Sequence, residues 1–204
     1  MKIRRVRATD LDDVMRVEKS AWPLEIRASR EQLIERYNVY PQGFLVAENQ
    51  GKVIGILTAQ RVDYQIGESP DGWEKTTNHG WIQTTHKAHG NALYVVSLGV
   101  DIKWQHNGVG SALIRAIQQH ARVLDLAYVL LDSRIPNYKL FYEKGMPVEV
   151  YALSANKNGE RIDPELRFYE RLGFQILSPS QIVPNCMARD SESLDYGVRM
   201  IWTR

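Results

Sequence analysis

The sequence predicts one domain of the mixed α/β (α+β) class, with a mixed central sheet of about seven strands flanked by about four helices. Three observations support this prediction. A strand–turn–strand pattern occupies residues 43–62, and a strand–helix–strand pattern occupies residues 93–132. No linker rich in Pro or Ser divides the 204 residues. This length suits a single domain, so we expect residues 1–204 to share one core.

The first elements are a short strand and two helices. Residues 3–7 alternate apolar and charged side chains, which is typical of a strand. Asp10 opens a helix, and Ser29 with Gln32 forms the capping box of a second helix. The apolar faces are Leu11, Val14, Met15 and Val17 on the first helix, and Leu33, Ile34 and Tyr37 on the second.

Two strands, residues 43–48 and 53–62, then form a hairpin around a polar turn. Residues 63–91 contain five glycines and prolines in an irregular pattern, which predicts a long excursion that serves as a wall facing the substrate. Trp73 and Trp81 lie in this excursion, and two interpretations are open for them: a homodimer contact or a lid.

A strand–helix–strand unit follows, with strands at residues 93–100 and 128–132 and a helix at residues 109–124. A right-handed crossover of this kind joins two parallel strands. The inner face of the helix carries Val109, Leu113, Ala116, Ile117 and Leu124.

The C-terminal part begins with a second irregular segment, residues 133–162. Asp163 is the expected N-cap of a helix over residues 164–172, because proline is favoured at the first helical position. Residues 174–177 and 196–202 are the last two predicted strands.

The composition of the chain limits the classes of partner that we expect it to bind. The net charge is only +2, from 26 basic and 24 acidic residues, which gives no electrostatic case for nucleic-acid binding. No apolar run is long enough to span a membrane, and the basic start of the chain lacks the apolar stretch of a signal peptide. Cys186 is the single cysteine, which suits a reducing compartment. We therefore expect a cytoplasmic protein that binds neither nucleic acid nor membrane.

A glycine loop between a strand and a helix predicts an anion site. Gln105, Gly108 and Gly110 form the pattern Gln-x-x-Gly-x-Gly directly before the helix. Free N–H groups and the helix dipole at such a place attract phosphate. The loop lacks the Gly-Lys-Ser/Thr ending of a P-loop, and Leu113 replaces the third glycine of a dinucleotide fingerprint.

This loop, with the order β-α-α-β-β-β-α-β-α-β-β, resembles the GNAT superfamily of acyl-CoA-dependent N-acyltransferases. The resemblance covers essentially the whole chain and implies the GNAT fold with acetyl-CoA as cofactor. It implies that the fourth strand splays from the fifth to admit the pantetheine arm, and that the loop holds the pyrophosphate. The cofactor-binding residues that it implies are Leu98, Gly99, Val100, Gln105, His106, Asn107, Gly108, Val109, Gly110 and Ser111.

The helix at residues 164–172 carries a second family landmark. Tyr169, Gly173 and Phe174 match the Tyr-x-x-x-Gly-Phe motif, in which the tyrosine lies near the cofactor sulfur. The resemblance therefore implies that Tyr169 hydrogen-bonds or protonates the leaving thiolate, and a phenol with a pKa of about 10 nearly matches an alkanethiol, so that the proton transfer would be nearly balanced. A buried core tyrosine is the alternative interpretation.

The sequence departs from the family upstream of this tyrosine. Ile162 stands where many members have an asparagine that contacts the cofactor, and Glu165 stands where alanine is common. Arg134 or Asn137 could replace the missing contact, since a guanidinium suits phosphate. Loop capping is the alternative role for both residues.

The sequence does not identify the base that must take a proton from the acceptor amine. An oxyanion would be met by a backbone N–H near Leu98 or Val100. We expect no metal site, because the histidines lack a matching Cys or acidic cluster, and we interpret Cys186 as incidental. The candidate bases are Glu18, Glu25, Glu48, Tyr94, Ser97, His79, His86 and His89, for each of which a structural role is the competing interpretation.

A narrower resemblance is to the GNAT domain that precedes nitrilase-type hydrolases in some bacteria. It rests on residues 91–94, 134–136, 163–168 and 195–197. The hydrolase is absent from these 204 residues, so the domain would act beside a separate amidase.

Taken together, these features predict an acetyl-CoA-dependent N-acetyltransferase that acts on a primary amine of a small molecule or peptide. Two alternatives are open: a non-catalytic CoA-binding sensor or scaffold of the same fold, and a nucleotide-binding domain of another type.

Overall fold

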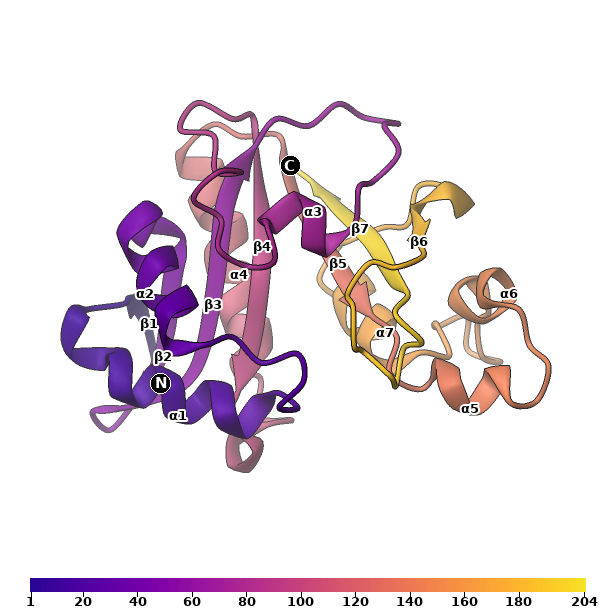
Figure 1. Ribbon diagram of the computed structural model, residues 1–204, viewed down its shortest axis with the longest axis horizontal. Coiled ribbons are helices and arrows are strands. Elements are labelled where there is room, and N and C mark those ends of the chain that lie inside the picture. Colours follow the sequence, from indigo (N-terminus) through magenta and orange to yellow (C-terminus); the bar gives the residue numbers. More distant parts are fainter.

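The computed structural model describes all residues, 1–204, and contains one seven-stranded mixed sheet. The strand order is β1-β2-β3-β4-β5-β7-β6 (Figure 1). Only β4 and β5 pair in parallel, as the predicted crossover requires. The strands are β1 (Lys2–Arg5), β2 (Phe44–Asn49), β3 (Lys52–Val62), β4 (Ala92–Val100), β5 (Tyr128–Arg134), β6 (Ile182–Val183) and β7 (Gly197–Thr203).

Four helices match the predicted ones: α1 (Leu11–Ala21), α2 (Arg30–Val39), α4 (Val109–Val123) and α7 (Pro164–Glu170). Helices α1 and α2 lie on one face of the sheet and α4 on the other (Figure 1). The capping box of Ser29 and Gln32 starts α2, and Asp163 caps α7 by accepting hydrogen bonds from the N–H groups of Glu165 and Leu166. These predicted helix starts are confirmed.

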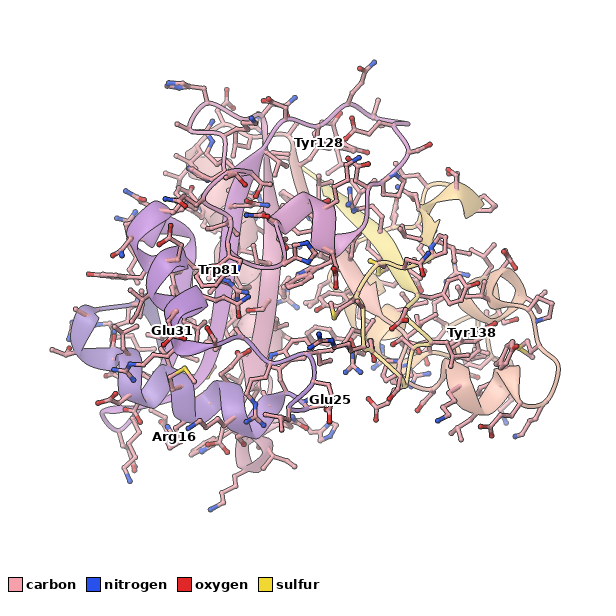
Figure 2. All side chains as sticks on the ribbon, viewed as in Figure 1. Arg16, Glu25, Glu31, Trp81, Tyr128 and Tyr138 are labelled. Carbon is pink, nitrogen blue, oxygen red and sulfur yellow. The ribbon has the colours of Figure 1, made fainter.

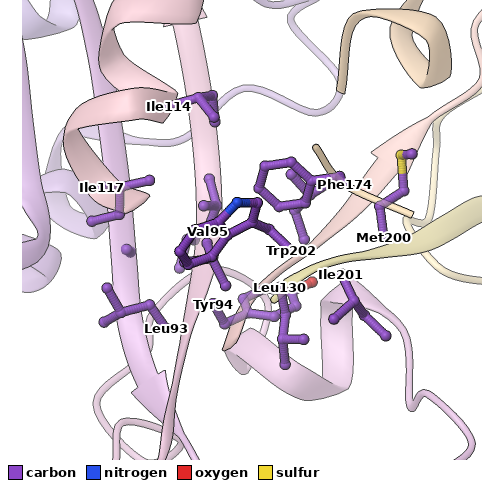
Figure 3. Close-up of a cluster of buried hydrophobic side chains, with 14 of the residues drawn as sticks. Leu93, Tyr94, Val95, Ile114, Ile117, Leu130, Phe174, Met200, Ile201 and Trp202 are labelled. Carbon is purple, nitrogen blue, oxygen red and sulfur yellow. The ribbon is translucent and has the colours of Figure 1, made fainter. Parts of the chain in front are cut away.

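The core has one layer on each face of the sheet, because successive strand residues point to opposite faces. On β2, Leu45 and Ala47 join the larger cluster against α4, while Phe44 and Val46 join the smaller cluster against α1 and α2. Figure 3 shows part of the larger cluster, where residues of α4, β4, β5 and β7 meet.

Three short helices were not predicted: α3 (Trp73–Thr77), α5 (Tyr138–Tyr142) and α6 (Val148–Leu153). The prediction that residues 133–162 are irregular is therefore wrong in part. Helices α5 and α6 form an aromatic cluster in which the Tyr138 ring lies 5.4 Å from Tyr151 and 5.8 Å from Tyr196. These helices have five and six residues, so tertiary packing stabilises them more than local sequence preference does.

The prediction of a strand at residues 174–177 is also wrong. That segment contributes a single bridge, between Gln175 and Ile201, and the two residues of β6 occupy the sheet edge instead. Ser178 and Pro179 start a 3-10 turn that ends the extended segment. None of the helices combines the length and the apolar character that crossing a bilayer requires.

Candidate functional site

Strands β4 and β5 part in the middle of the sheet. Their parallel pairing runs only from Ala92 and Tyr128 to Val95 and Leu131. The β3–β4 register shifts between Thr58 and Ala59, so β4 carries one extra residue at this point. Such a bulge bends the strand that carries it, which gives a physical reason for the splay expected between these strands.

The bent end of β4 leaves backbone groups free on the side away from β3. The Asp101 N–H donates to Ile54 O at 3.0 Å, toward β3. Since strand N–H groups alternate in direction, those of Leu98 and Val100 face the splay. The bulge carbonyl of Val96 accepts the indole N–H of Trp73 at 2.7 Å.

The glycine loop leads from β4 to α4. Gly108 has φ +76° and His106 has φ +62°, so the chain turns through the left-handed region twice before the helix begins. The backbone N–H groups from Gln105 to Ser111 donate no hydrogen bond to other backbone groups. They lie at the N-terminus of a 15-residue helix, where the dipole adds positive potential. The loop therefore has the donors and the field that a pyrophosphate needs.

Helix α7 packs against the start of α4. A Cβ at Gly110 would lie 3.3 Å from the Phe168 ring, so glycine allows this close approach. The next residue, Tyr169, packs edge-on against Phe168 and Phe174, and its hydroxyl has no hydrogen bond within the chain. The Tyr169 hydroxyl is thus available to a ligand.

The electrostatics at Tyr169 favour one of its two expected roles, hydrogen bonding over proton transfer. Burial, with the nearby carboxyl of Glu165, raises the pKa of Tyr169 well above its ordinary value. A nearly balanced proton transfer to a thiolate is therefore not what this environment provides, and the phenol is suited to donating a hydrogen bond. Burial also raises the pKa of Glu165 to about 8.

The prediction that Arg134 contacts the cofactor phosphate does not fit its surroundings in the structure. Its guanidinium is buried and donates to Asp190 at 2.6 and 2.7 Å and to Glu192 at 2.8 Å. With two carboxylates bound, it offers no free positive charge to a phosphate. Asn137 precedes α5, is exposed and caps no backbone group, so its predicted cofactor contact stays a prediction.

A pocket of about 440 Å³ lies on the α1–α2 side of β4. Figure 2 labels Glu25 on the segment between α1 and α2, which forms one wall. The excursion 63–91 contributes Trp73, Glu74 and His79 to the lining, and its expected role as a wall facing the substrate stays a prediction. The remaining lining residues are Glu18, Trp22, Ile26, Arg27, Ala28, Gln32, Arg36, Val96, Ser97, Met187, Ala188 and Arg189.

Two side chains from the end of α1 present unpaired polar atoms in this region. Glu18 is 1% exposed; its Oε1 accepts the Ala28 N–H at 2.8 Å, and its Oε2 has no partner. Burial raises the pKa of Glu18, and the charge of Arg36 partly opposes the rise. The buried Nε1 of Trp22 is also unpaired and lies 3.3 Å from the position that a Gly99 Cβ would take.

Arg36 on α2 is a second buried charge in the pocket wall, 2% exposed. It donates to Gly80 O at 2.7 Å and makes longer contacts with the hydroxyls of Thr58 and Ser97. Burial lowers the pKa of Arg36 to about 10. Sequence reasoning missed this residue, because an arginine between the apolar positions of an amphipathic helix is normally solvated.

Of the other seven candidate bases, Glu25 and His89 are exposed and have no side-chain partner, and the remaining five have partners within the chain. Tyr94 donates to Asp132 at 2.8 Å, Ser97 bonds Thr58 at 3.0 Å, and His79 pairs with Glu74 at 2.7 Å. The remaining contacts are His86 with the Arg61 N–H and Glu48 with Arg4. No group of three or more His, Cys, Asp or Glu side chains is arranged to hold a metal ion.

The family model described as Acetyltransferase (GNAT) family matches residues 11–146. The uncharacterized N-acetyltransferase YkwB of Bacillus subtilis (strain 168) is 31% identical over 206 residues, covering 99% of this chain and 88% of that one. The probable hydrolase YhcX of the same strain is 28% identical over 202 residues, covering 99% of this chain. The chain spans only 38% of the length of YhcX.

Among solved structures, the GphF GNAT-like decarboxylase in complex with isobutyryl-CoA superposes with a TM-score of 0.83 at 28% identity. The alignment covers 100% of this chain and 99% of that one. These comparisons confirm the family resemblance and the predicted fold class.

Proposed function

Because this chain belongs to the acetyltransferase (GNAT) family, we propose that it transfers the acetyl group of acetyl-CoA to a primary amine of a small molecule or peptide. The observation that carries the proposal is that β4 and β5 separate after Val95 and Leu131, and that the separation lies next to both a glycine loop and a pocket. The glycine loop with free N–H groups begins where β4 ends, and the pocket with the unpaired Glu18 carboxylate oxygen lies on the α1–α2 side of β4.

The loop residues would hold the cofactor by backbone donors. The N–H groups of residues 105–111 would bind the pyrophosphate, with the Ser111 hydroxyl beside them. The free N–H groups of Leu98 and Val100 would bind the pantetheine arm and the oxyanion. When bound, acetyl-CoA supplies an activated thioester.

The residues around the splay would then complete the reaction. The Tyr169 hydroxyl, which has no partner in the chain, would donate a hydrogen bond toward the departing sulfur. The acceptor would enter the pocket of about 440 Å³. An amine would find the unpaired Glu18 oxygen in the lining of this pocket as a hydrogen-bond acceptor.

A second candidate is decarboxylation of an acyl-CoA that carries a second carboxylate. It is favoured by the full-length similarity to the GphF GNAT-like decarboxylase. In that case Arg36 would be the side chain that attracts the carboxylate.

One assay separates the candidates. The protein is incubated with acetyl-CoA and a panel of primary amines, and free thiol and acetylated amine are measured. The transferase predicts amine-dependent thiol release. In parallel, malonyl-CoA is supplied without an amine, and conversion to acetyl-CoA without thiol release would support decarboxylation. Binding of acetyl-CoA with neither reaction would instead support a non-catalytic CoA-binding module.

A further inference from the structure

The pocket contains most of the unsatisfied polar atoms of the buried side chains. Three such atoms lack a hydrogen-bond partner in the whole chain: Glu18 Oε2, Trp22 Nε1 and Tyr64 Oη. Glu18 and Trp22 both line the pocket, one helical turn apart, and offer one acceptor and one donor. Buried polar atoms without partners are costly, so a ligand that paired with these two atoms would gain from both hydrogen bonds.

The Glu18 carboxylate is held in one orientation. Its Oε1 accepts the N–H of Ala28, which lies on the connection between α1 and α2, so the side chain is anchored to a second segment. It forms no ion pair with Arg36, whose hydrogen bonds go to Gly80, Thr58 and Ser97. The second oxygen is therefore fixed and free.

Resting on the proposed function, we propose that Glu18 is the catalytic base, and that its Oε2 takes a proton from the ammonium group of the acceptor. An alkylamine is almost entirely protonated at neutral pH, so its lone pair must be released before it can attack. Glu18 becomes neutral in this step, which also relieves the cost of a buried charge.

The deprotonated amine then attacks the thioester. The amine nitrogen forms a bond to the thioester carbonyl carbon, and the carbon–sulfur bond then breaks. The nitrogen loses its second proton to the departing thiolate, which leaves as the thiol. Glu18 then gives up its proton to water, so the sum is one amide, one thiol and one released proton.

The charges around Glu18 support this role. Burial raises its pKa, which makes the carboxylate a stronger base than an exposed glutamate, and the positive charge of Arg36 partly opposes that rise. The positive charge of Arg36 also disfavours the ammonium form of a nearby acceptor. The other charged groups that line the pocket are Arg27, Glu25, Glu74, His79 and Arg189.

The other carboxylates of the pocket are less suited. Glu74 already contacts His79 at 2.7 Å and accepts the Ala188 N–H at 2.8 Å. Glu25 is exposed to solvent, which stabilises its carboxylate without a ligand. Only Glu18 combines burial with a free oxygen.

The test uses Glu18→Gln, which has the same shape and keeps an oxygen for the Ala28 N–H. Transfer from acetyl-CoA is measured with ethylamine and with 2,2,2-trifluoroethylamine, which is similar in size but largely neutral at pH 7. We expect transfer to ethylamine to fall by about 100-fold or more, and transfer to trifluoroethylamine to change little, because the second amine needs no base. The Kd for acetyl-CoA should stay unchanged. Glu35→Gln, the same change on α2 outside the pocket, is the matched control.

Each other outcome has a distinct meaning. If Glu18→Gln slows both amines equally, Glu18 has a structural role and the inference is overturned. If it slows neither, another group is the base. If the wild-type protein transfers acetyl to neither amine nor to any amine of the panel, the proposed function itself fails.

Discussion

The cofactor half of the proposed site and its acceptor half are built in different ways. The proposed cofactor half lies mainly in one stretch, residues 98–111, and would act through backbone N–H groups. The acceptor half takes side chains from residues 18–36, 73–79, 96–97 and 187–189. A backbone site depends on glycines and a helix start, whereas the pocket depends on the identity and burial of distant side chains. Substitutions should therefore separate cofactor binding from transfer.

The largest expected effect is loss of cofactor binding in Gly110→Glu. A side chain at this position meets the Phe168 ring at 3.3 Å and places a carboxylate where the pyrophosphate would lie. We expect the Kd for acetyl-CoA, measured by calorimetry, to rise by about 100-fold or more, since like charges and a clash act together. Gln119→Glu adds the same charge on an exposed part of α4 and should leave the Kd unchanged. An unaltered Kd in Gly110→Glu would remove the loop from the cofactor site.

A smaller effect is expected for Tyr169→Phe, which removes the free hydroxyl and keeps the ring between Phe168 and Phe174. We expect kcat for acetyl transfer to fall by about 100-fold while the Kd for acetyl-CoA stays the same. Steady-state kinetics and calorimetry measure the two quantities. Unchanged kcat would show that Tyr169 is a core residue only.

Arg36→Gln should affect stability and the acceptor half but not the cofactor half. It removes the charged donor to Gly80 O and the positive charge that balances buried Glu18. We expect the free energy of unfolding to fall by about 1.5–3 kcal/mol, measured by urea denaturation. The exposed Arg115→Gln on α4 is the control and should leave stability nearly unchanged. Weakened acetyl-CoA binding by the folded Arg36→Gln variant would contradict the division into two halves.

The smallest expected effect is a pH-dependent change in Tm for Glu18→Gln. Because the folded pKa of Glu18 is raised, its stabilising contribution is present below its unfolded pKa and is lost as pH rises through the raised value. The Tm of Glu18→Gln minus that of wild type should therefore increase as the pH rises above the ordinary pKa of a glutamate. A difference that stays constant or falls with pH would show that Glu18 is not destabilised by its charge in the folded state.

The parts of the molecule that the sequence could predict are those encoded locally. The Ser29 capping box, the Asp163 cap and the β4–loop–α4 unit each depend on residues a few positions apart, and all are present in the structure. Helices α5 and α6 could not be predicted in the same way, because aromatic contacts between distant segments hold them.

The residues of the candidate site also differ in whether local sequence could predict them. The glycine spacing before α4 and the Tyr169 motif were visible in the sequence. The burial of Glu18 and Arg36 was not, because it depends on how α1 and α2 pack on β4. Arg134 was assigned to phosphate from its chemistry alone, and its pairing with Asp190 arises from a contact 56 residues away in the sequence.

The most direct test of the two-half site is a titration of the isotope-labelled protein with acetyl-CoA, followed by amide chemical shifts. We expect large, saturable shifts of the amides in residues 98–111, with Gly108 and Gly110 among the most affected. Addition of an acceptor amine should then shift amides around Glu18 and Arg36. Saturable binding that leaves residues 105–111 unchanged would rule out the two-half site, because the N–H groups of these residues are the proposed ligands of the pyrophosphate.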